Sequence, residues 1–436
     1  MRQAGPLGDD EVDTLLGGLQ GQGVIALAVS GGPDSLALLH LVDRWAQRRH
    51  PRPLLVVLTV DHGLRAGSDT EAVTVGQLAA TRGLRHQTFL WEGPKPPTGI
   101  EAAAREARYR LLGLAARQAG ARVLITAHHQ DDQAETVLMR LARGSGLAGL
   151  GGMEGQRLLG GGGVVLIRPF LDVPKARLVA TAAAAGFTPA EDAMNTDPRF
   201  ARARLRRVMP GLAGEGVDAA AIARAARLFR RADEALARAT RIYLGRSVIA
   251  NPLGMARLER SGLLDEAPEI RFRALGAIIA SVGGSGATPG EDQLSALDAA
   301  VVSTRPFRRT LGGAVIRTRG RDIVIHREPG RMDVAETPLP PGYCGLWDGR
   351  FEVAVGDREG VSLGPLAAQG YAELPVACRA RPRAAAETVP AFRWDGRLVA
   401  VPAVGFAAPG SHGLRAVEFA AARLAGPAPG SDSEPA

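Results

Sequence analysis

The sequence predicts an α/β protein: a doubly wound parallel sheet, followed by a helical domain and a small mixed α/β C-terminal domain. Three observations lead to this prediction. Short apolar runs alternate with amphipathic helical segments from residue 24 to residue 185, which is typical of a parallel sheet with right-handed crossovers. From about Gly216 to Ile242 the sequence becomes an alanine- and arginine-rich helix, and no strand is expected until Thr310. Beyond Ala314, glycine and proline separate short apolar runs, which indicates strands and turns.

The length of 436 residues is too great for one ordinary core, so several domains are expected. We predict an αβ domain, a helical domain, a C-terminal domain and a tail at residues 1–212, 213–310, 311–425 and 426–436. Ser281–Gly290 is rich in glycine but lacks the lysine of a phosphate-binding loop, so it is predicted to be a linker. The tail is rich in Pro, Ser and Gly, which predicts disorder.

The first strand of the αβ domain is predicted at Val24–Val29. Its apolar residues are continuous rather than alternating, which fits a strand covered on both faces. Pro33 at the first helical position and Asp34 in the first turn then start a helix toward Arg48. The other strands are predicted at 54–60, 86–91, 123–126 and 164–168, and the helices at 68–81, 101–119, 131–143 and 174–185.

Capping residues mark the ends of these helices. Ser68 and Glu71 match a capping box at the start of the second helix. Gly120, Gly144 and Gly186 follow the last residues of the next three, where a glycine commonly ends a helix.

The tetrapeptide WDGR occurs twice in the C-terminal domain, at Trp347–Arg350 and Trp394–Arg397. An Asp-Gly pair between apolar segments predicts a β-hairpin. Two copies are too few for a propeller, so we expect one small domain.

Composition limits the class of protein. Lys and Arg outnumber Asp and Glu by 53 to 45, giving a formal net charge of +8, which favours a polyanionic partner. The only cysteines, Cys344 and Cys378, form neither a zinc pattern nor a disulfide framework, and their function is left open. No apolar run approaches the roughly 18 residues of a membrane span, and the N-terminus lacks a signal-peptide core. We therefore expect a cytoplasmic protein without membrane contact.

The stretch VSGGPDS, at Val29–Ser35, predicts a phosphate-binding loop. Backbone N–H groups at a helix start, together with the hydroxyls of Ser30 and Ser35, form an anion site. The common mononucleotide loop needs a lysine before its closing hydroxyl residue, but Asp34 stands there instead. A carboxylate beside a phosphate requires a bridging divalent cation, so Asp34 is a candidate Mg²⁺ ligand. The predicted ATP-binding residues are Ser30, Gly31, Gly32, Pro33, Asp34 and Ser35.

A second stretch, AHHQDDQAET at Ala127–Thr136, leaves the fourth predicted strand and enters a helix. Its polar residues therefore cluster at the edge of the sheet where α/β proteins bind ligands. Asp132 and Glu135 share one helix face. Zinc is disfavoured because the histidines lack the usual helical spacing. Acidic side chains also favour a helix start, yet two histidines and two aspartates exceed what capping requires. These four residues are His128, His129, Asp131 and Asp132.

The segment AREARY places Arg105 and Arg108 on one face of the preceding helix. Arginine suits phosphate because its planar donors bind oxygens bidentately and remain charged.

The loop at Val29–Ser35 resembles the pyrophosphatase-type loop (PP-loop) of enzymes that cleave ATP between its α and β phosphates. With the other motifs, the sequence resembles the tRNA(Ile)-lysidine synthases. The resemblance rests on VSGGPDS, VDHGLR, AREARY, AHHQDDQAET, RGSGLAGLGGM, RPF and DPRFARARLR, which keep their order between residues 24 and 210. The later segments agree with the long form of the family in order and size. The chain departs from the family at Met194-Asn195 and Arg202-Ala203, where Ser-Asn and Arg-Asn are frequent.

The resemblance implies a two-step reaction on the wobble cytidine of an isoleucine tRNA with the anticodon CAU. ATP first adenylates the C2 oxygen of the base and releases pyrophosphate. The ε-amine of free L-lysine then displaces AMP from C2. ATP and Mg²⁺ are the expected cofactors, and the tRNA and free lysine are the expected partners. The oligomeric state is left open between a monomer and a homodimer.

The resemblance also implies residue roles. Asp34 would hold Mg²⁺, and Arg105 would neutralise charge during adenylyl transfer. His128 and Asp131 would position the base or move protons, and Asp132 and Glu135 would bind the lysine ammonium groups. The predicted tRNA-binding residues form a basic stretch and are Arg199, Arg202, Arg204, Arg206 and Arg207.

Two alternatives were weighed. A PP-loop tRNA thiolase generally needs cysteines that carry a persulfide or a cluster, and the αβ domain has none. A non-catalytic RNA-binding protein would tolerate the loss of Asp34, Asp131 and Asp132, yet all three are present.

Overall fold

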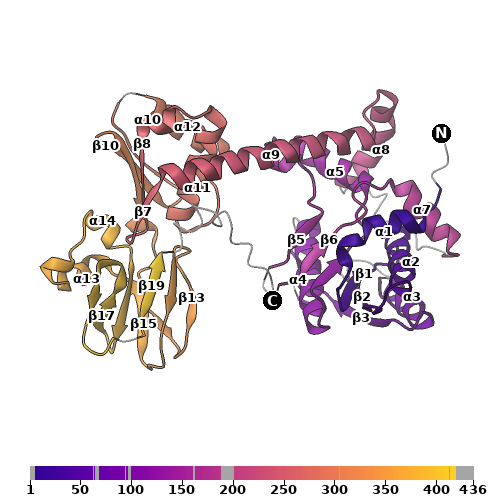
Figure 1. Ribbon diagram of the computed structural model, residues 1–436, viewed down its shortest axis with the longest axis horizontal. Helices are drawn as coiled ribbons and strands as arrows, with labels where there is room; N and C mark the ends of the chain where they lie inside the picture. The colour runs from indigo at the N-terminus through magenta and orange to yellow at the C-terminus, as the bar shows by residue number, and fades with distance from the viewer. Residues whose placement is uncertain are drawn as a thin grey trace. The chain divides into compact units, whose positions relative to one another are not determined.

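The structure is a computed structural model that describes residues 5–61, 63, 68–93, 95–96, 100–160, 163–187, 201–303, 305–411 and 413–418. The chain divides into two compact units, Met1–Asp233 and Glu234–Ala436. Helix α9, Ala219–Ser247, is continuous and contains the boundary between them (Figure 1).

The first unit is built on a six-stranded sheet with the strand order β3-β2-β1-β4-β6-β5. The strands are β1 Val24–Ala28, β2 Leu54–Asp61, β3 Arg85–Leu90, β4 Val123–Ile125, β5 Gln156–Leu158 and β6 Val165–Ile167. All neighbouring pairs are parallel except β5 and β6, which are antiparallel. The predicted doubly wound parallel sheet is confirmed. The edge strand β5 was not expected, because it is short and exposed and has no apolar run.

Helices cover both faces of this sheet. The helices of this unit are α1 Asp9–Leu15, α2 Pro33–Gln47, α3 Ser68–Thr81, α4 Ile100–Gln118, α5 Gln130–Leu141, α6 Leu147–Leu150, α7 Lys175–Ala184 and α8 Ala201–Gly214. Ile25 and Leu27 of β1 join a core with α1, α2, α3 and α7, whereas Ala26 joins a second core with α4. Strand β1 is therefore buried on both faces, as its continuous apolar run predicts.

The strand order fixes where a ligand site can form. From β1 the chain adds β2 and β3 on one side, then returns to place β4 on the other side of β1. The carboxyl ends of β1 and β4 therefore flank a topological switch point, which is where open α/β sheets bind ligands.

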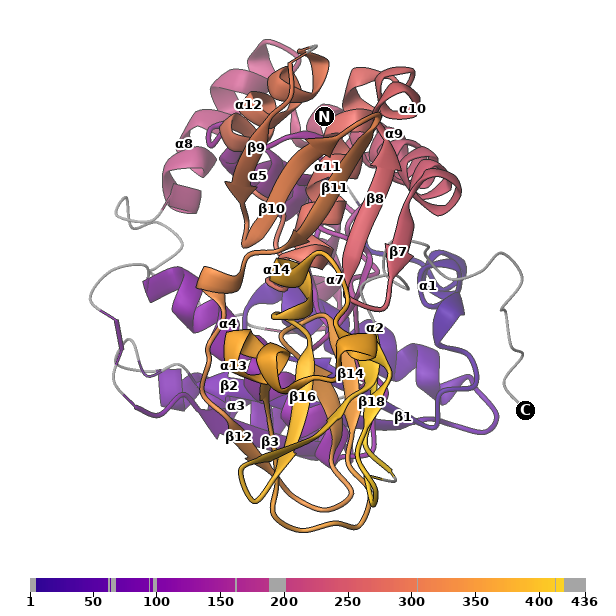
Figure 2. The ribbon, with the colours of Figure 1, turned by 90° about the vertical axis from the view of Figure 1, so that its left-hand side faces the viewer.

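The second unit begins with a five-stranded antiparallel sheet in the order β7-β8-β11-β10-β9. Its strands are β7 Ile249–Asn251, β8 Met255–Glu259, β9 Arg308–Leu311, β10 Ala314–Arg319 and β11 Asp322–Arg327. Its helices are α10 Arg260–Leu264, α11 Pro268–Val282 and α12 Glu291–Val302. Helix α11 packs on one face of the sheet (Figure 2). The expectation of no strand before Thr310 is wrong: β7 and β8 are short, and the pairing of β8 with β11 is a long-range contact that a local pattern cannot reveal.

The C-terminal part contains two further antiparallel sheets, β12-β15-β16-β17-β18 and β13-β14-β19. The strands are β12 Thr337–Leu339, β13 Cys344–Trp347, β14 Phe351–Ala354, β15 Val361–Pro365, β16 Pro390–Trp394, β17 Arg397–Val401, β18 Phe406–Ala407 and β19 Arg415–Glu418. The short helices are α13 Ala367–Glu373 and α14 Arg383–Ala386.

Both WDGR copies form the predicted hairpins, β13–β14 and β16–β17. Asp348 and Gly349 have φ values of 46° and 62°, and Asp395 and Gly396 have 50° and 75°. A tight hairpin turn of this type needs positive φ at both central residues, which Asp-Gly tolerates well.

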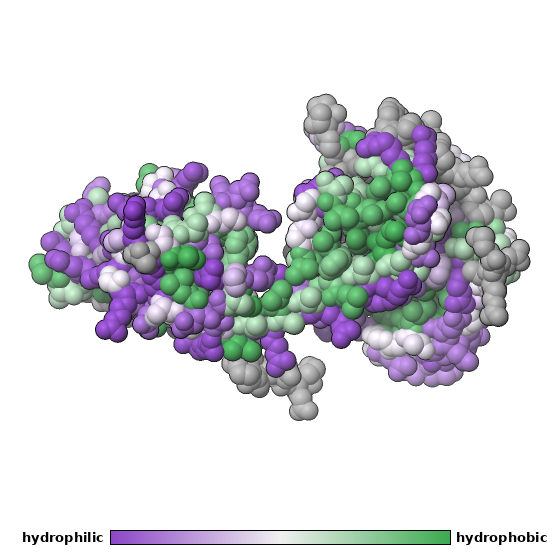
Figure 3. Space-filling view, turned by 90° about the horizontal axis from the view of Figure 1, so that it is seen from above, coloured by the Kyte–Doolittle hydropathy of each residue, from purple (hydrophilic) through white to green (hydrophobic). Residues whose placement is uncertain are grey.

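None of the helices in the described part of the chain is long and apolar enough to cross a membrane. Hydrophilic residues cover much of the surface in Figure 3, and hydrophobic residues gather on part of the first unit, at the right of that view.

Candidate active site at the carboxyl ends of β1 and β4

The loop after β1 is a preformed turn closed by Ser35. The Ser35 hydroxyl donates to the carbonyl of Gly32 at 2.9 Å and accepts from the N–H of Ser30 at 3.1 Å. Gly31 has a φ of +88°, a conformation that side chains rarely adopt. No side chain caps the start of α2, so its first N–H groups remain directed at the loop. The loop is therefore shaped to receive an anion.

Replacing Ser35 with alanine removes both hydrogen bonds. We expect ATP to bind roughly tenfold more weakly, because about 1–2 kcal/mol of loop preorganisation is lost. Calorimetric titration with ATP measures the change. Ser285→Ala, in the second unit, is the matched control. An unchanged ATP affinity in Ser35→Ala would show that the loop keeps its shape without this hydroxyl.

Asp34 lies in the first turn of α2 and points at the loop after β4. Its Oδ2 lies 3.4 Å from Nε2 of His129. Its Oδ1 is buried and has no hydrogen-bond partner among the described residues. An orphaned carboxylate oxygen beside a phosphate loop fits a Mg²⁺ ion, which uses one or two carboxylates and takes its other ligands from phosphates and water. In the described part of the chain, no three His, Cys, Asp or Glu side chains come together as metal ligands.

His129 is buried and caps the start of α5. Its Nδ1 accepts from the N–H of Asp132 at 3.3 Å, and Asp132 Oδ2 accepts from the N–H of His129 at 3.1 Å. Because Nδ1 accepts, the ring proton lies on Nε2, which faces Asp34. Burial alone would lower the pKa of His129, but the hydrogen bond that its Nε2 donates to Asp34 and the charge of Asp132 raise it overall.

The predicted lysine-binding residues, Asp132 and Glu135, lie beside Arg206, which was predicted to bind tRNA. Glu135 is buried, and Arg206 of α8 donates to both of its oxygens, through Nε at 2.6 Å and Nη2 at 3.3 Å. Arg206 Nη2 also lies 4.0 Å from Asp132 Oδ1, and Arg202 Nε lies 4.0 Å from Glu135 Oε2. A continuous chain of charged groups therefore runs from the loop through His129 to α8.

His128, next to His129, lies in the opposite electrostatic environment. Its Nδ1 is 2.8 Å from the hydroxyl of Thr126. Burial and the charges of Arg105 and Arg168 hold the pKa of His128 well below its usual value, so the ring is neutral near pH 7. Arg105 lies over the ring of Tyr109, with 5.1 Å from its guanidinium carbon to the ring centroid.

The remaining predicted residues lie nearby, with one exception. Asp131 Oδ2 accepts from the N–H of Lys175 at 2.9 Å, at the start of α7. Arg204 and Arg207 are exposed on α8. Arg199 lies outside the described residues. No role was predicted for Thr126 or Arg168; the RPF motif was the available signal for Arg168, whereas no motif pointed to Thr126.

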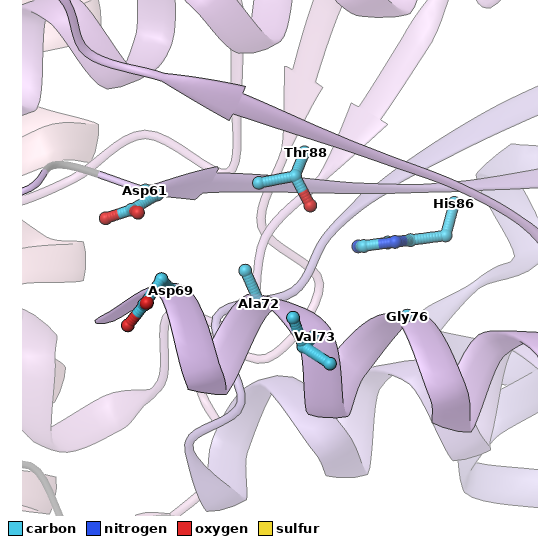
Figure 4. A pocket seen from close by; sticks show the side chains of 7 residues that line it. All are labelled: Asp61, Asp69, Ala72, Val73, Gly76, His86 and Thr88. Atoms are coloured by element: carbon cyan, nitrogen blue, oxygen red, sulfur yellow. The ribbon is translucent and has the colours of Figure 1, made fainter. Parts of the chain in front are cut away.

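A separate cavity of about 410 Å³ lies between α3 and strands β2 and β3 (Figure 4). Asp61 and Asp69 lie at one end and His86 at the other. His86 Nε2 is 2.9 Å from the hydroxyl of Thr59, and burial lowers its pKa. No residue of the loop or of the histidine and aspartate cluster lines this cavity.

Comparison with known proteins gives three findings. Residues 9–212 match the family model of the PP-loop domain. The chain is 49% identical over 317 residues to a tRNA(Ile)-lysidine synthase of Methylobacterium nodulans, covering 71% of this chain and 91% of that protein. It is 37% identical over 389 residues to one of Ruegeria pomeroyi, covering 88% and 89%. Among solved structures, a U34-tRNA thiolase from Methanococcus maripaludis aligns with a TM-score of 0.44 and 17% identity, over 51% of this chain and 78% of that one.

Proposed function

The chain belongs to the tRNA(Ile)-lysidine synthases, and from this membership we propose that it joins free L-lysine to C2 of the wobble cytidine in the CAU-anticodon isoleucine tRNA. One ATP is cleaved to AMP and pyrophosphate in each cycle. The base is adenylated first, and the lysine ε-amine then displaces AMP.

One observation carries this proposal: a phosphate loop and a set of carboxylates belong to one connected cluster. Asp34 of the loop is 3.4 Å from His129, and the Asp132 carboxylate accepts from the N–H of His129 at 3.1 Å. Adenylation and amine transfer need the nucleotide and the amine to reach the same base, so adjacent sites suit the reaction.

The loop residues 30–35 would bind the β and γ phosphates, which leave as pyrophosphate. Asp34 Oδ1 would hold Mg²⁺, which supplies charge neutralisation for the leaving group when bound. Arg105 would face the α phosphate and stabilise the negative charge that develops on it.

Lysine would bind through its ammonium groups, which need carboxylate partners. Half-buried Asp132 and buried Glu135 are the acids beside the loop. Arg206 already holds both oxygens of Glu135, so lysine must share or displace this arginine. His128 is kept neutral by its lowered pKa, so its ring would position the base rather than take up the proton of the ε-ammonium group.

The tRNA would lie along the basic start of α8. Arg204 and Arg207 are exposed there, and Arg202 is partly exposed. Arginine contacts with phosphates provide affinity without reading sequence.

AMP release tests the proposal. Purified protein with ATP and Mg²⁺ should form AMP and pyrophosphate only with the CAU-anticodon isoleucine tRNA, and the amounts should rise when lysine is added. An isoleucine tRNA with a different anticodon is the control. Binding of the tRNA without AMP formation would favour the non-catalytic RNA-binding alternative.

A further inference from the structure

The turn that leads from α6 into β5 is held by side chains from two other helices. Gln133 of α5 pairs with both backbone groups of Met153: its Nε2 donates to the Met153 carbonyl at 2.9 Å, and its Oε1 accepts from the Met153 N–H at 2.6 Å. Arg230 of α9 donates to the same carbonyl at 2.7 Å and also to the carbonyl of Gly151. We call Gln133 and Arg230 the Met153 clamp. The reaction proposed above assigns no role to either residue.

The sequence of this turn fits the Met153 clamp. Gly152 has a φ of +71°, and a Cβ at that position would lie 2.7 Å from Gln133 Oε1. Any other residue at 152 would therefore push Gln133 away from Met153. Arg140 fixes the same turn by donating to the carbonyls of Gly149 and Gly152 at 2.8 and 2.7 Å. The turn is therefore hydrogen-bonded along its length.

Arg105 lies against this turn. Among the described residues, its half-buried guanidinium contacts the Met153 thioether, with 3.9 Å from Nη2 to Sδ, and the ring of Tyr109. A thioether and an aromatic ring are weak partners for a guanidinium group. Packing between the Tyr109 ring and the buried Met153 side chain therefore determines where this guanidinium lies.

We propose that Gln133 and Arg230 are positioning residues for adenylyl transfer: by fixing Met153, they hold Arg105 where it faces the α phosphate. A misplacement of about 1 Å can cost roughly 100-fold in rate, so a residue that holds a catalytic group affects turnover without touching substrate. The role of Arg105 at the α phosphate rests on the proposed function. The dependence of its position on the Met153 clamp does not.

Chemical labelling of Arg105 tests the proposal without turnover. The full-length wild type and its variants are treated with phenylglyoxal, and peptide mass spectrometry measures the modification of Arg105. Labelling should rise several-fold in Arg230→Met and in Met153→Ala, because the guanidinium loses the packing that holds it. Arg227→Met is the matched control and should keep the wild-type level, because Arg227 also joins α9 to the first unit but does so through Asp172, outside the turn.

AMP formation measures the consequence for the reaction. Arg230→Met should lower kcat roughly tenfold and change the KM for ATP by less than about twofold, because the phosphate loop is untouched. Arg230→Lys should recover part of kcat, since an ammonium group can also donate to the two carbonyls. When Arg105 is already replaced in Arg105→Met, adding Arg230→Met should have little further effect. A residue with a merely structural role would lower kcat equally with and without Arg105.

Wild-type labelling of Arg105 in both Arg230→Met and Met153→Ala would overturn the proposal, as would additive losses of kcat in the double variant. If Arg230→Met unfolds, which circular dichroism detects, Met153→Ala decides, because it keeps the backbone hydrogen bonds and removes only the side chain that contacts Arg105. A failure of the proposed function gives a different result. The wild-type protein would then form no AMP, and the labelling of Arg105 would still decide whether the Met153 clamp positions it.

Discussion

Replacing Asp34 with alanine is expected to reduce AMP formation by roughly 100-fold or more and to leave the fold intact. The carboxylate is partly exposed, and its Oδ1 has no partner among the described residues, so the fold loses little beyond the 3.4 Å contact of Oδ2 with His129. In our proposal the bound nucleotide does depend on this carboxylate, because Asp34 would hold Mg²⁺ beside the phosphates. Rates of AMP release, measured against Mg²⁺ concentration, check this expectation.

Two further variants make the Asp34 experiment decisive. Asp34→Asn keeps the shape and loses the charge, so it should be nearly as slow as the alanine variant. Asp10→Ala removes an exposed carboxylate from α1 and should behave as wild type. Near-normal turnover of Asp34→Ala at saturating Mg²⁺ would remove Asp34 from the mechanism.

The second large effect is expected at the pair Glu135–Arg206. Glu135→Gln removes a buried negative charge that Arg206 and, in our proposal, the lysine ammonium groups both use. We expect the KM for lysine to rise at least about tenfold while the KM for ATP changes little. The free energy of unfolding should also fall, by roughly 3 kcal/mol, because Arg206 loses the charged carboxylate that accepts two of its hydrogen bonds. Steady-state kinetics and denaturant unfolding measure the two effects.

A double-mutant cycle separates the two roles of Glu135. In Glu135→Gln with Arg206→Gln, neither member carries a charge, so the loss of stability should be smaller than the sum of the single losses. Lysine use should not recover, because the carboxylate is still missing. A raised KM for ATP with an unchanged KM for lysine would reverse the assignment of the lysine site.

The contact between Glu135 and Arg206 also changes which arginines of the basic stretch are suitable for testing tRNA binding. The sequence alone groups Arg202, Arg204 and Arg206 as tRNA contacts. In the structure Arg206 is held by Glu135, whereas Arg204 is exposed. Arg204→Gln is therefore the cleaner probe of tRNA binding, and replacing Arg206 also disturbs the carboxylates.

Local sequence patterns were sufficient for the centre of the fold. The continuous apolar run of β1 and the glycine turn after it are determined by residues adjacent in the sequence, so both can be predicted from the sequence alone. The two WDGR hairpins were predictable for the same reason, since Asp-Gly fits a turn with positive φ. Strands β5, β7 and β8 were not predicted because they are only three, three and five residues long. Strands β5 and β7 pair with the next strand along the chain, whereas β8 also pairs with the distant strand β11.

The candidate site, like the fold, has one part that the sequence predicts and another that depends on long-range contacts. The strand ends predicted that the loop and the His-Asp stretch would meet, and Asp34 and His129 do lie 3.4 Å apart. The contact between Glu135 and Arg206 joins residues 71 positions apart on two helices, and no spacing rule connects them. The opposite surroundings of His128 and His129 likewise arise from helices that converge only in the folded chain.

Analysis of the modified base tests the central claim most directly. The protein is incubated with ATP, isotope-labelled lysine and unmodified CAU-anticodon isoleucine tRNA, and the digested nucleosides are examined by mass spectrometry. Our account predicts that the wobble cytidine gains one labelled lysine with loss of one water, and that omission of ATP or lysine prevents this. An unchanged wobble cytidine in the presence of all three substrates, or a base that gains sulfur when a sulfur donor is added, would contradict it.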